Sequence, residues 1–226
     1  MLDQIVGEIL SGSFAPRDQI SERYLVTRFG VSRTPVREAI KRLFERGLVE
    51  AGPKGVAVVA EIADEDIGKL YAVRLMIEGY AAALTAANIT AREITELRKI
   101  NRSFASALRK RDLVQMLEVR SRFHAVIAAA THNRWLAEIM VMLRERAYVV
   151  RHFHWKDSAR AAQTLTIHEL MIDALQARDA RAYRDLVTQQ IQAAIECYDN
   201  QLRPRAAKLV APRRSRGIGR GIGVKA

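Results

Sequence analysis

The sequence predicts a mainly α-helical protein in two parts, three short helices with a β-hairpin followed by an all-α helical bundle. Along most of the 226 residues, apolar side chains recur at the three- and four-residue spacing of helices. A short β-prone stretch with a Gly- and Pro-containing centre lies at residues 48–59. Beyond residue 62 there is no β-rich run or long Gly/Pro-rich loop, and the remaining length suffices for a separate core.

The first two helices are predicted from apolar residues that share one face. Gly12 ends the first run, which contains Leu2, Ile5, Val6, Ile9 and Leu10. A second short helix is expected over residues 21–29, with Leu25 and Phe29 on its apolar side. Residues 30–31, Gly and Val, form a turn of the length used between two crossed helices.

The third helix is predicted within SRTPVREAIKRL, residues 32–43. Proline suits the first helical position and disfavours helical backbone in the residue before it, which predicts Thr34 as the N-cap and Pro35 as the first helical residue. The basic side chains lie away from the apolar face and are Arg33, Arg37, Lys41 and Arg42. A helix N-terminus attracts anions, so these arginines indicate a site for phosphates and base edges. For this stretch alone, a solvated surface helix is the alternative.

The β-hairpin follows the third helix directly. Residues 48–50 and 56–59 are β-prone, and AGPKG at 51–55 has the punctuation of a hairpin loop. Helix, turn, basic helix and hairpin together predict a winged helix-turn-helix, with Lys54 near the tip of the wing and against a sugar-phosphate backbone.

This N-terminal part resembles the winged helix-turn-helix of the GntR family of bacterial transcription regulators. The matching motifs are ILSG at 9–12, Pro16, ISER at 20–23, FGVSRTPVREA at 29–39, RL at 42–43, GLV at 47–49 and Gly55. Arg17 and Val26 depart from the family pattern, both outside the recognition helix. The resemblance implies DNA contacts, in the major groove and to phosphates, from Arg23, Ser32, Arg33, Thr34 and Arg37. It also implies that the wing glycine, Gly55, lets the loop approach the minor groove.

Behind a short acidic link, the chain predicts a globular helical bundle. Its six expected helices are 64–87, 91–109, 112–130, 134–155, 158–177 and 180–202. The segments have no fixed-length repeat, which excludes a solenoid. We therefore divide the chain into a DNA-binding domain at 1–62, a helical effector-binding and dimerisation domain at 63–202, and a basic tail at 203–226.

The helical domain resembles the FCD effector-binding domain of the FadR subgroup. The resemblance is carried by RLMIE at 74–78, Phe123 with His124, Asn133, His168, Ala174 and Asp179. In that family the pocket commonly holds a divalent metal through an Asp four residues before the first His and through two further His. Aligned on His124, the Asp position is Arg120. Counted from His168, the last His position is Gln190.

This departure argues against a metal. Arg120 and His124 are one helical turn apart and should point into one pocket. A guanidinium repels a dication, and two His with a neutral Gln lack a carboxylate that would offset the charge. We expect no cofactor, with Zn or another divalent metal on His124 and His168 as the alternative.

The same positions favour an acidic ligand. Arginine pairs with a carboxylate through two hydrogen bonds, so Arg120 would replace the metal's charge and bind a small carboxylic acid directly. His124, His168 and Gln190 would complete the pocket, and two further residues, Arg144 and Tyr148, are spaced to share a face and line it. Three alternatives stay open: Arg120 turned outward to a surface acid, a register shifted towards Glu118, and no small ligand at all.

Charge and cysteine content bear on partners and compartment. The formal net charge is +12, and residues 203–226 hold eight Lys or Arg and no acid. The tail is rich in Gly, Pro and Arg without a helical period, which predicts disorder and either a salt-sensitive DNA tether or a solvated terminus. Cys197 is the one cysteine, which excludes an internal disulfide framework and is typical of a cytoplasmic protein. No apolar run is long enough for a membrane span.

The two parts together predict a sequence-specific transcription regulator, by default a repressor, controlled by a small organic acid. Helix-turn-helix proteins usually read two half-sites as a two-fold dimer, so the expected partners are a short palindromic duplex and a second copy of the chain. The sequence has no Gly-rich phosphate loop, HExxH or GxSxG, which argues against an enzyme. A ligand-independent, architectural DNA-binding protein is the alternative.

Overall fold

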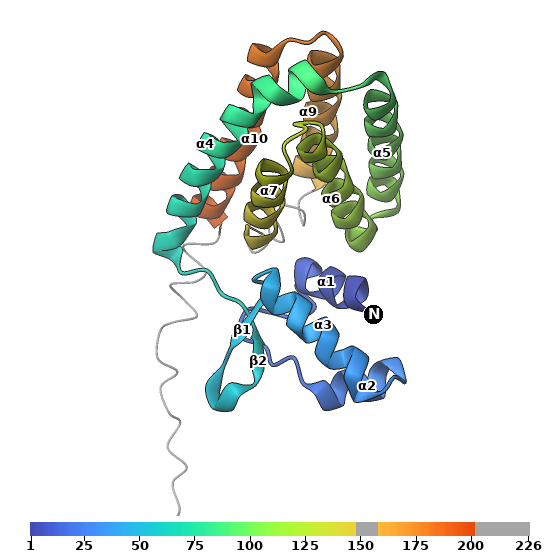
Figure 1. Ribbon diagram of the computed structural model, residues 1–226, viewed down its shortest axis with the longest axis vertical. Coiled ribbons are helices and arrows are strands. Elements are labelled where there is room, and N and C mark those ends of the chain that lie inside the picture. The colour runs from blue at the N-terminus through green and yellow to red at the C-terminus, as the bar shows by residue number, and fades with distance from the viewer. Residues whose placement is uncertain (148–157, 202–226) are drawn as a thin grey trace, which may run out of the picture.

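The computed structural model describes residues 1–147 and 158–201. These residues form two hydrophobic cores, one in the winged N-terminal part and one in the helical part (Figure 1). A short connection leads from the hairpin into the first long helix, and the winged part lies at one end of the bundle (Figure 1). The predicted mainly α-helical architecture is confirmed.

The winged part begins with three helices, α1 (Leu2–Ser11), α2 (Glu22–Phe29) and α3 (Arg33–Glu45). Left-handed glycines end the first two helices, Gly12 at φ 73° and Gly30 at φ 62°. Glycine takes this backbone without the steric penalty of a Cβ. The fully buried side chains at the centre of this core include Ile5, Ile9, Leu25, Val36, Leu43 and Leu48. The apolar faces read from the sequence are therefore the ones that pack.

The predicted start of α3 is wrong by two residues. Ser32 is the N-cap, and Pro35 is the third residue of the helix instead of the first. The first four N–H groups of a helix have no intrahelical partner, so a proline at the third position removes no hydrogen bond. Ser32 therefore lies at the entrance of the helix and Thr34 in its first turn, although the Ser32 side chain makes no capping hydrogen bond.

The wing is an antiparallel hairpin of β1 (Val49–Ala51) and β2 (Ala57–Val59), joined through the 3-10 turn η1 (Pro53–Gly55). Val49 pairs with Val59 and Ala51 with Ala57. The chain before α2 runs along the outer side of β2, where the Ile20 amide donates to the Ala57 carbonyl at 2.8 Å. This extra pairing supports the edge of the hairpin.

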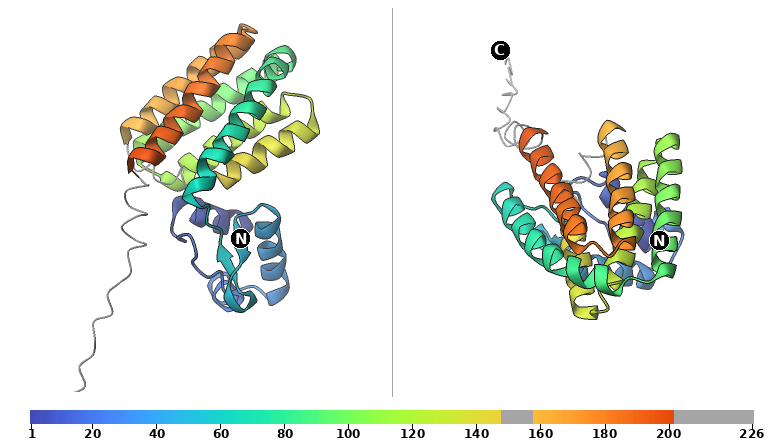
Figure 2. Two further views of the ribbon diagram at one scale, coloured as in Figure 1. Left: turned by 90° about the vertical axis from the view of Figure 1, so that its left-hand side faces the viewer. Right: turned by 90° about the horizontal axis from the view of Figure 1, so that it is seen from above.

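The helical part consists of α4 (Asp64–Asn88), α5 (Ala91–Lys110), α6 (Leu113–Ala129), α7 (Arg134–Arg146), α9 (Ser158–Gln176) and α10 (Ala180–Gln201). Helices α4 and α10 lie side by side, and α9 packs on both α5 and α10 (Figure 2). Helix α6 lies between α5 and α7, and α1 of the winged part also packs on α6. The buried aromatic side chains Tyr71, Phe104 and Phe123 lie in this core.

The predicted helix boundaries agree to within one residue except at the fourth helix, expected to reach residue 155. The described helix ends at Arg146 with Ala147 as its C-cap, and residues 148–157 lie outside the described part. The basic tail at 203–226 also lies outside it. Within the residues that the structure describes, no helix has the length and hydropathy to span a membrane.

Candidate functional site

Two groups of polar side chains could carry function, one on the surface of the winged part and one inside the helical part. The surface group sits where α2 and α3 begin. Helix α2 is capped by the Ser21 hydroxyl oxygen, which accepts from the Tyr24 amide at 3.4 Å. Buried Leu25 on α2 and Val36 on α3 hold the two helices in the same core.

All the predicted reading residues of these helices have exposed side chains: Arg23, Ser32, Arg33, Thr34 and Arg37. The last four lie at the entrance and in the first turns of α3, as the recognition helix of a helix-turn-helix requires. Arg37 Nε lies 3.1 Å from both carboxylate oxygens of Glu22 at the start of α2. This exposed pair is worth little to stability, so the guanidinium can be transferred to a phosphate at low cost.

Of the two residues predicted in the wing, the structure describes Gly55 in full. Gly55 is exposed at φ 74°, a left-handed conformation that favours glycine at the hairpin turn. The side chain of Lys54 lies outside the described part, although its backbone is in η1. The turn therefore has a backbone conformation that favours glycine at position 55, while its approach to the minor groove and the basic contact of Lys54 stay predictions.

One contact within the winged part has no local signal in the sequence. Arg28 near the end of α2 pairs with Glu8 on α1, with 2.6 Å between Nη1 and Oε2, and its Nη1 also donates to the Tyr24 hydroxyl at 3.0 Å. The hydrogen bond to Glu8 raises the pKa of the Arg28 guanidinium. The pair ties α2 to the helix that packs on the bundle.

The interior group is a buried polar cluster formed by Arg74 and Glu78 on α4, Arg120 and His124 on α6, Arg144 on α7, and His168 on α9. All six side chains are at most 8% exposed. Arg120 is buried while Glu118 on the same helix is exposed, so Arg120 points inward and does not pair with a surface acid. The structure therefore brings together four of the predicted effector residues.

The other two predicted effector residues are placed less fully. Gln190 lies half-buried on α10, and its Nε2 is buried with no hydrogen-bond partner among the described residues. Tyr148 lies outside the described residues. Arg74 and Glu78 belong to the motif that resembles the FCD domain, but the sequence did not predict them as site residues. Their four-residue spacing was nevertheless a signal that they could pair.

Glu78 is held by two arginines. Arg74 donates from Nε to Oε1 of Glu78 at 3.0 Å, and Nη2 of Arg144 donates to Oε2 from the neighbouring helix. Burial by itself raises the pKa of Glu78, but the charges of Arg144 and Arg74 outweigh it and leave the pKa below its ordinary value. Glu78 is thus a permanent anion that balances one of the buried guanidinium groups.

The two histidines lie against each other and against an aromatic ring. Their ring centroids are 5.4 Å apart at 85°, and Phe123 stacks on His168 at 4.0 Å. Burial lowers the pKa of both imidazoles well below the ordinary value, and the charges of Arg144 and Arg120 lower it further. Each ring is therefore neutral and carries one donor and one acceptor nitrogen.

Several nitrogen atoms of this cluster, donors and acceptors, make no hydrogen bond within residues 1–147 and 158–201. They are Nε and Nη1 of Arg144 and both ring nitrogens of His124 and His168. Buried polar groups are nearly always satisfied, by protein, water or ligand, since leaving them bare costs free energy. The cluster therefore has hydrogen-bonding capacity that the described residues leave unused.

The donor set fits a metal poorly. Across the described ranges no group of three or more His, Cys, Asp and Glu could hold a metal ion. The carboxylate of the cluster, Glu78, is already bound by Arg74 and Arg144. Zinc takes three or four protein ligands, and with Glu78 bound by the arginines the cluster has only two imidazoles to offer.

Comparison with known proteins gives matches over both parts. Residues 2–59 match the family model "Bacterial regulatory proteins, gntR family", and residues 69–193 match the model "FCD domain". The HTH-type transcriptional regulator McbR of Escherichia coli K12 is 25% identical over 186 residues, spanning 81% of this chain and 84% of that protein. The gluconate operon transcriptional repressor of Bacillus licheniformis is 28% identical over 194 residues, spanning 81% and 75%.

Solved structures show the same fold. The structure of E. coli McbR/YncC superimposes with a TM-score of 0.76 at 23% identity, covering 88% of this chain and 95% of that one. A putative GntR transcriptional regulator from Rhodococcus sp. RHA1 has a TM-score of 0.70 at 24% identity, covering 88% and 96%. The arrangement of the winged part and the helical bundle is therefore shared with these proteins.

Proposed function

This chain belongs to the GntR family of bacterial regulatory proteins and carries an FCD domain, and from that premise we propose that it is a repressor controlled by a small carboxylic acid. As a member of the family it is a DNA-binding transcription regulator and not an enzyme. The proposal concerns the ligand, its site and the direction of control. The acid binds in the buried polar cluster and lowers the affinity of the winged part for its operator.

The observation that carries the proposal is the set of buried donors around Arg144. Its Nη2 is bound to Glu78, while Nε and Nη1 make no hydrogen bond among the described residues. A carboxylate accepts strong, charge-assisted hydrogen bonds from a guanidinium. With Arg74 and Arg144, Arg120 is the third buried guanidinium group beside the single carboxylate of Glu78, so the electrostatic potential there favours an anion.

The neutral histidines suit a ligand that also carries hydroxyl groups. An imidazole with one donor and one acceptor nitrogen can accept from a hydroxyl or donate to an oxygen. His124 and His168 provide four such nitrogens in the cluster. A hydroxy acid therefore matches the cluster better than a purely aliphatic acid, and one relative is named for the gluconate operon.

We propose binding without a metal. In place of a dication, Arg120 and Arg144 supply the positive charge that holds the carboxylate. A zinc ion on His124 and His168 would need further ligands and would lie close to buried guanidinium groups. Added chelator should accordingly leave the ligand response unchanged.

The proposed assembly is a homodimer on a palindromic operator. A winged helix-turn-helix reads one half-site through the entrance of α3, and two half-sites require a second copy related by a two-fold axis. Repression is the direction proposed, and relatives of the chain are named repressors.

The test is fluorescence anisotropy of a labelled operator, found by genomic selection with the full-length protein, against a scrambled duplex at two salt concentrations. Gluconate, citrate and acetate are titrated with EDTA and, separately, with added Zn²⁺. We expect a strong operator preference that a hydroxy acid weakens in both backgrounds. A response that appears only with Zn²⁺ overturns the metal-free site. Equal binding to both duplexes without a ligand effect favours the architectural DNA binder.

A further inference from the structure

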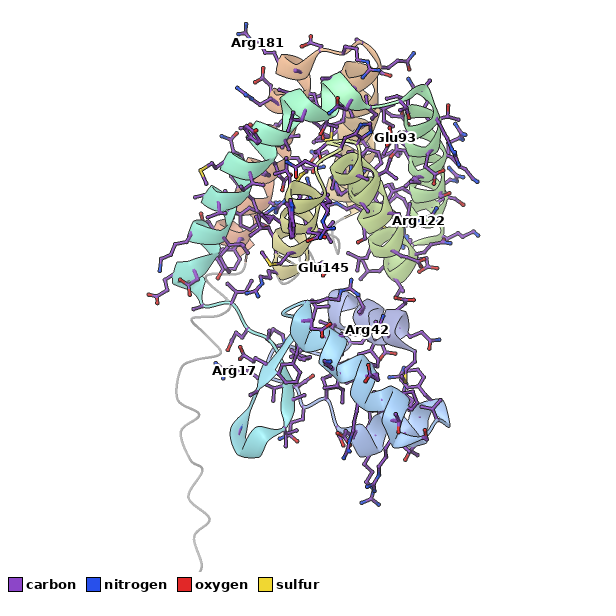
Figure 3. The ribbon with its side chains drawn as sticks, in the orientation of Figure 1. Arg17, Arg42, Glu93, Arg122, Glu145 and Arg181 are labelled. Carbon is purple, nitrogen blue, oxygen red and sulfur yellow. The ribbon has the colours of Figure 1, made fainter. Side chains whose placement is uncertain are left out.

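The last turn of α7 connects the buried polar cluster to the winged part through three consecutive residues. Arg144 points inward and binds Glu78. Glu145 lies at the end of the bundle that faces the winged part (Figure 3). Its Oε2 accepts from Nε of Arg46 at 2.9 Å. Arg146 lies over Gly47, and a Cβ added there would come within 3.0 Å of its guanidinium. One helical turn therefore touches both functional parts of the molecule.

The two residues that α7 reaches in the winged part end the recognition helix. Arg46 is the C-cap of α3, with its amide donating to the Arg42 carbonyl at 3.1 Å. Gly47 follows at φ 65° and turns the chain towards β1. Because α3 is one continuous helix of 13 residues, a displacement at Arg46 can be passed along it to the exposed residues at its N-terminus.

The Arg46–Glu145 ion pair is more buried than an ordinary surface ion pair. The side chains of Arg46 and Glu145 are 32% and 13% exposed, and two hydrogen bonds join them. Bidentate pairing with partial burial gives such a pair geometric specificity that exposed pairs lack. It can therefore hold the end of α3 in one position relative to α7.

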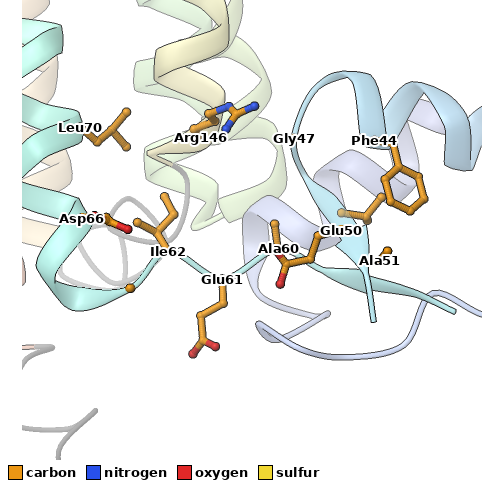
Figure 4. A pocket seen from close by; sticks show the side chains of 12 residues that line it. Phe44, Gly47, Glu50, Ala51, Ala60, Glu61, Ile62, Asp66, Leu70 and Arg146 are labelled. Carbon is orange, nitrogen blue, oxygen red and sulfur yellow. The ribbon is translucent and has the colours of Figure 1, made fainter. Parts of the chain in front are cut away.

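The junction is open beside the Gly47–Arg146 contact, next to the hairpin and the start of α4. A cavity of about 640 Å³ lies between the two parts, lined by Phe44, Gly47, Glu61, Asp66, Leu70 and Arg146 among others (Figure 4). Close packing would lock the two parts together, because packed cores do not deform continuously. The junction is hollow on this side, while α1 packs on α6, so the winged part has room to change its tilt about the α1–α6 contact.

From these contacts we propose that the last turn of α7 couples the buried polar cluster to the recognition helix. A change in the Arg144–Glu78 pair rotates or shifts this turn, which alters the Arg46–Glu145 pair and with it the orientation of α3. The coupling rests on the proposed function, in which an anion acts at Arg144. Glu145 and Arg46 are thus positioning residues for operator binding, since neither lies at the predicted DNA surface.

The test is a double-mutant cycle that needs no small molecule. Operator dissociation constants are measured for the full-length wild type, Glu78→Gln, Glu145→Gln and the double variant. Glu138→Gln is the matched control, because Glu138 is exposed on the same helix and makes no ion pair in the described part of the chain. The cycle is then repeated with Glu138→Gln in place of Glu145→Gln.

We expect Glu78→Gln to change the operator dissociation constant about fivefold or more, within the usual range of allosteric coupling. That change should disappear in the Glu145→Gln background and persist in the Glu138→Gln background. An equal effect in both backgrounds overturns the coupling through Glu145. No effect of Glu78→Gln on the operator in any background overturns it as well.

A second substitution guards against a variant that does not fold. Arg144→Lys keeps the charge at the cluster but removes the planar guanidinium, and it is taken through the same cycle if circular dichroism shows that Glu78→Gln is unfolded. The cycle is independent of the acid titrations, because it contains no acid. Failure of the proposed ligand and failure of the coupling are therefore separate results.

Discussion

Arg144 and Glu78 meet across the interface between α7 and α4, where Nη2 of the arginine donates to Oε2 of the carboxylate and both side chains are almost wholly buried. Arg74, one turn before Glu78 on α4, donates to the other carboxylate oxygen. One carboxylate thus sets the positions of two buried guanidinium groups next to two neutral histidines.

Glu78→Gln should destabilise the helical part by roughly 3–5 kcal/mol, because it leaves two buried guanidinium groups without their carboxylate. Urea unfolding followed by circular dichroism measures the loss. Glu96→Gln is the control, since it removes an exposed pair with Arg122 at 3.5 Å and should cost at most about 1 kcal/mol. Equal losses of unfolding free energy would show that the buried ion pairs of Glu78 stabilise the protein no more than the exposed pair does.

Stability should fall as the pH drops below about 6.5, the ordinary histidine value. The folded pKa of His124 and His168 lies well below that value, so the unfolded chain binds more protons in this window and gains at the expense of the fold. Each histidine contributes up to about 1.4 kcal/mol per pH unit. Unfolding free energies at pH 7.5, 6.5 and 5.5 measure the slope.

Two variants test whether the buried histidines cause this change of unfolding free energy with pH. His124→Gln should reduce it, since the variant has one buried imidazole fewer. His132→Asn replaces an exposed histidine in a left-handed turn at φ 51°, a conformation that Asn tolerates. A slope that stays unchanged in His124→Gln would contradict the assignment to the cluster.

Arg33→Ala should weaken operator binding by about 1–3 kcal/mol and relax the preference at the base it reads, because the side chain is exposed at the entrance of α3. Anisotropy with single-base operator variants separates this effect from a uniform loss. Arg109→Ala, an exposed change near the end of α5, removes the same charge from the helical part. An equal loss in both variants would mean that net charge, and not the position of Arg33, carries the binding.

Gly47→Ala should cost more stability than Gly30→Ala. Both glycines are left-handed, at φ 65° and 62°, so both substitutions carry a strain of about 1–2 kcal/mol. A Cβ at Gly30 meets nothing within 4 Å, whereas at Gly47 it meets the Arg146 guanidinium at 3.0 Å. The additional substitution Arg146→Ala should remove the extra loss of stability in Gly47→Ala, as measured by calorimetry. If the excess persists without that side chain, the cause lies elsewhere.

Arg120→Ala should abolish the response to carboxylic acids while operator binding stays intact, because Arg120 is buried in the cluster far along the chain from the reading residues. The readout is the acid-induced change in operator anisotropy. Arg122→Ala, an exposed change on the same helix, should respond as the wild type does. Loss of both operator binding and response would refute the division of labour between the two parts.

Local patterns predicted the elements well for physical reasons that act over a few residues. The apolar spacing of Val36, Ala39 and Leu43 marks the face of α3 that is buried, and Gly30 ends α2 as the turn requires. The predicted start of α3 was wrong because proline is tolerated at several positions of the first helical turn, so Pro35 does not fix where the helix begins. The capping box of Thr90 and Glu93, in contrast, places the start of α5 at a single residue.

The sequence by itself determined the helices, the hairpin, the family and the candidate reading residues, because helical periodicity, caps and contiguous motifs are properties of neighbouring residues. It also placed Arg120 and His124 on one face, since they are one turn apart. Only the tertiary structure decided that Glu78 binds Arg144 and that Arg46 binds Glu145, because those partners lie 66 and 99 positions apart. Such pairs depend on how whole helices cross and pack, which no local pattern records.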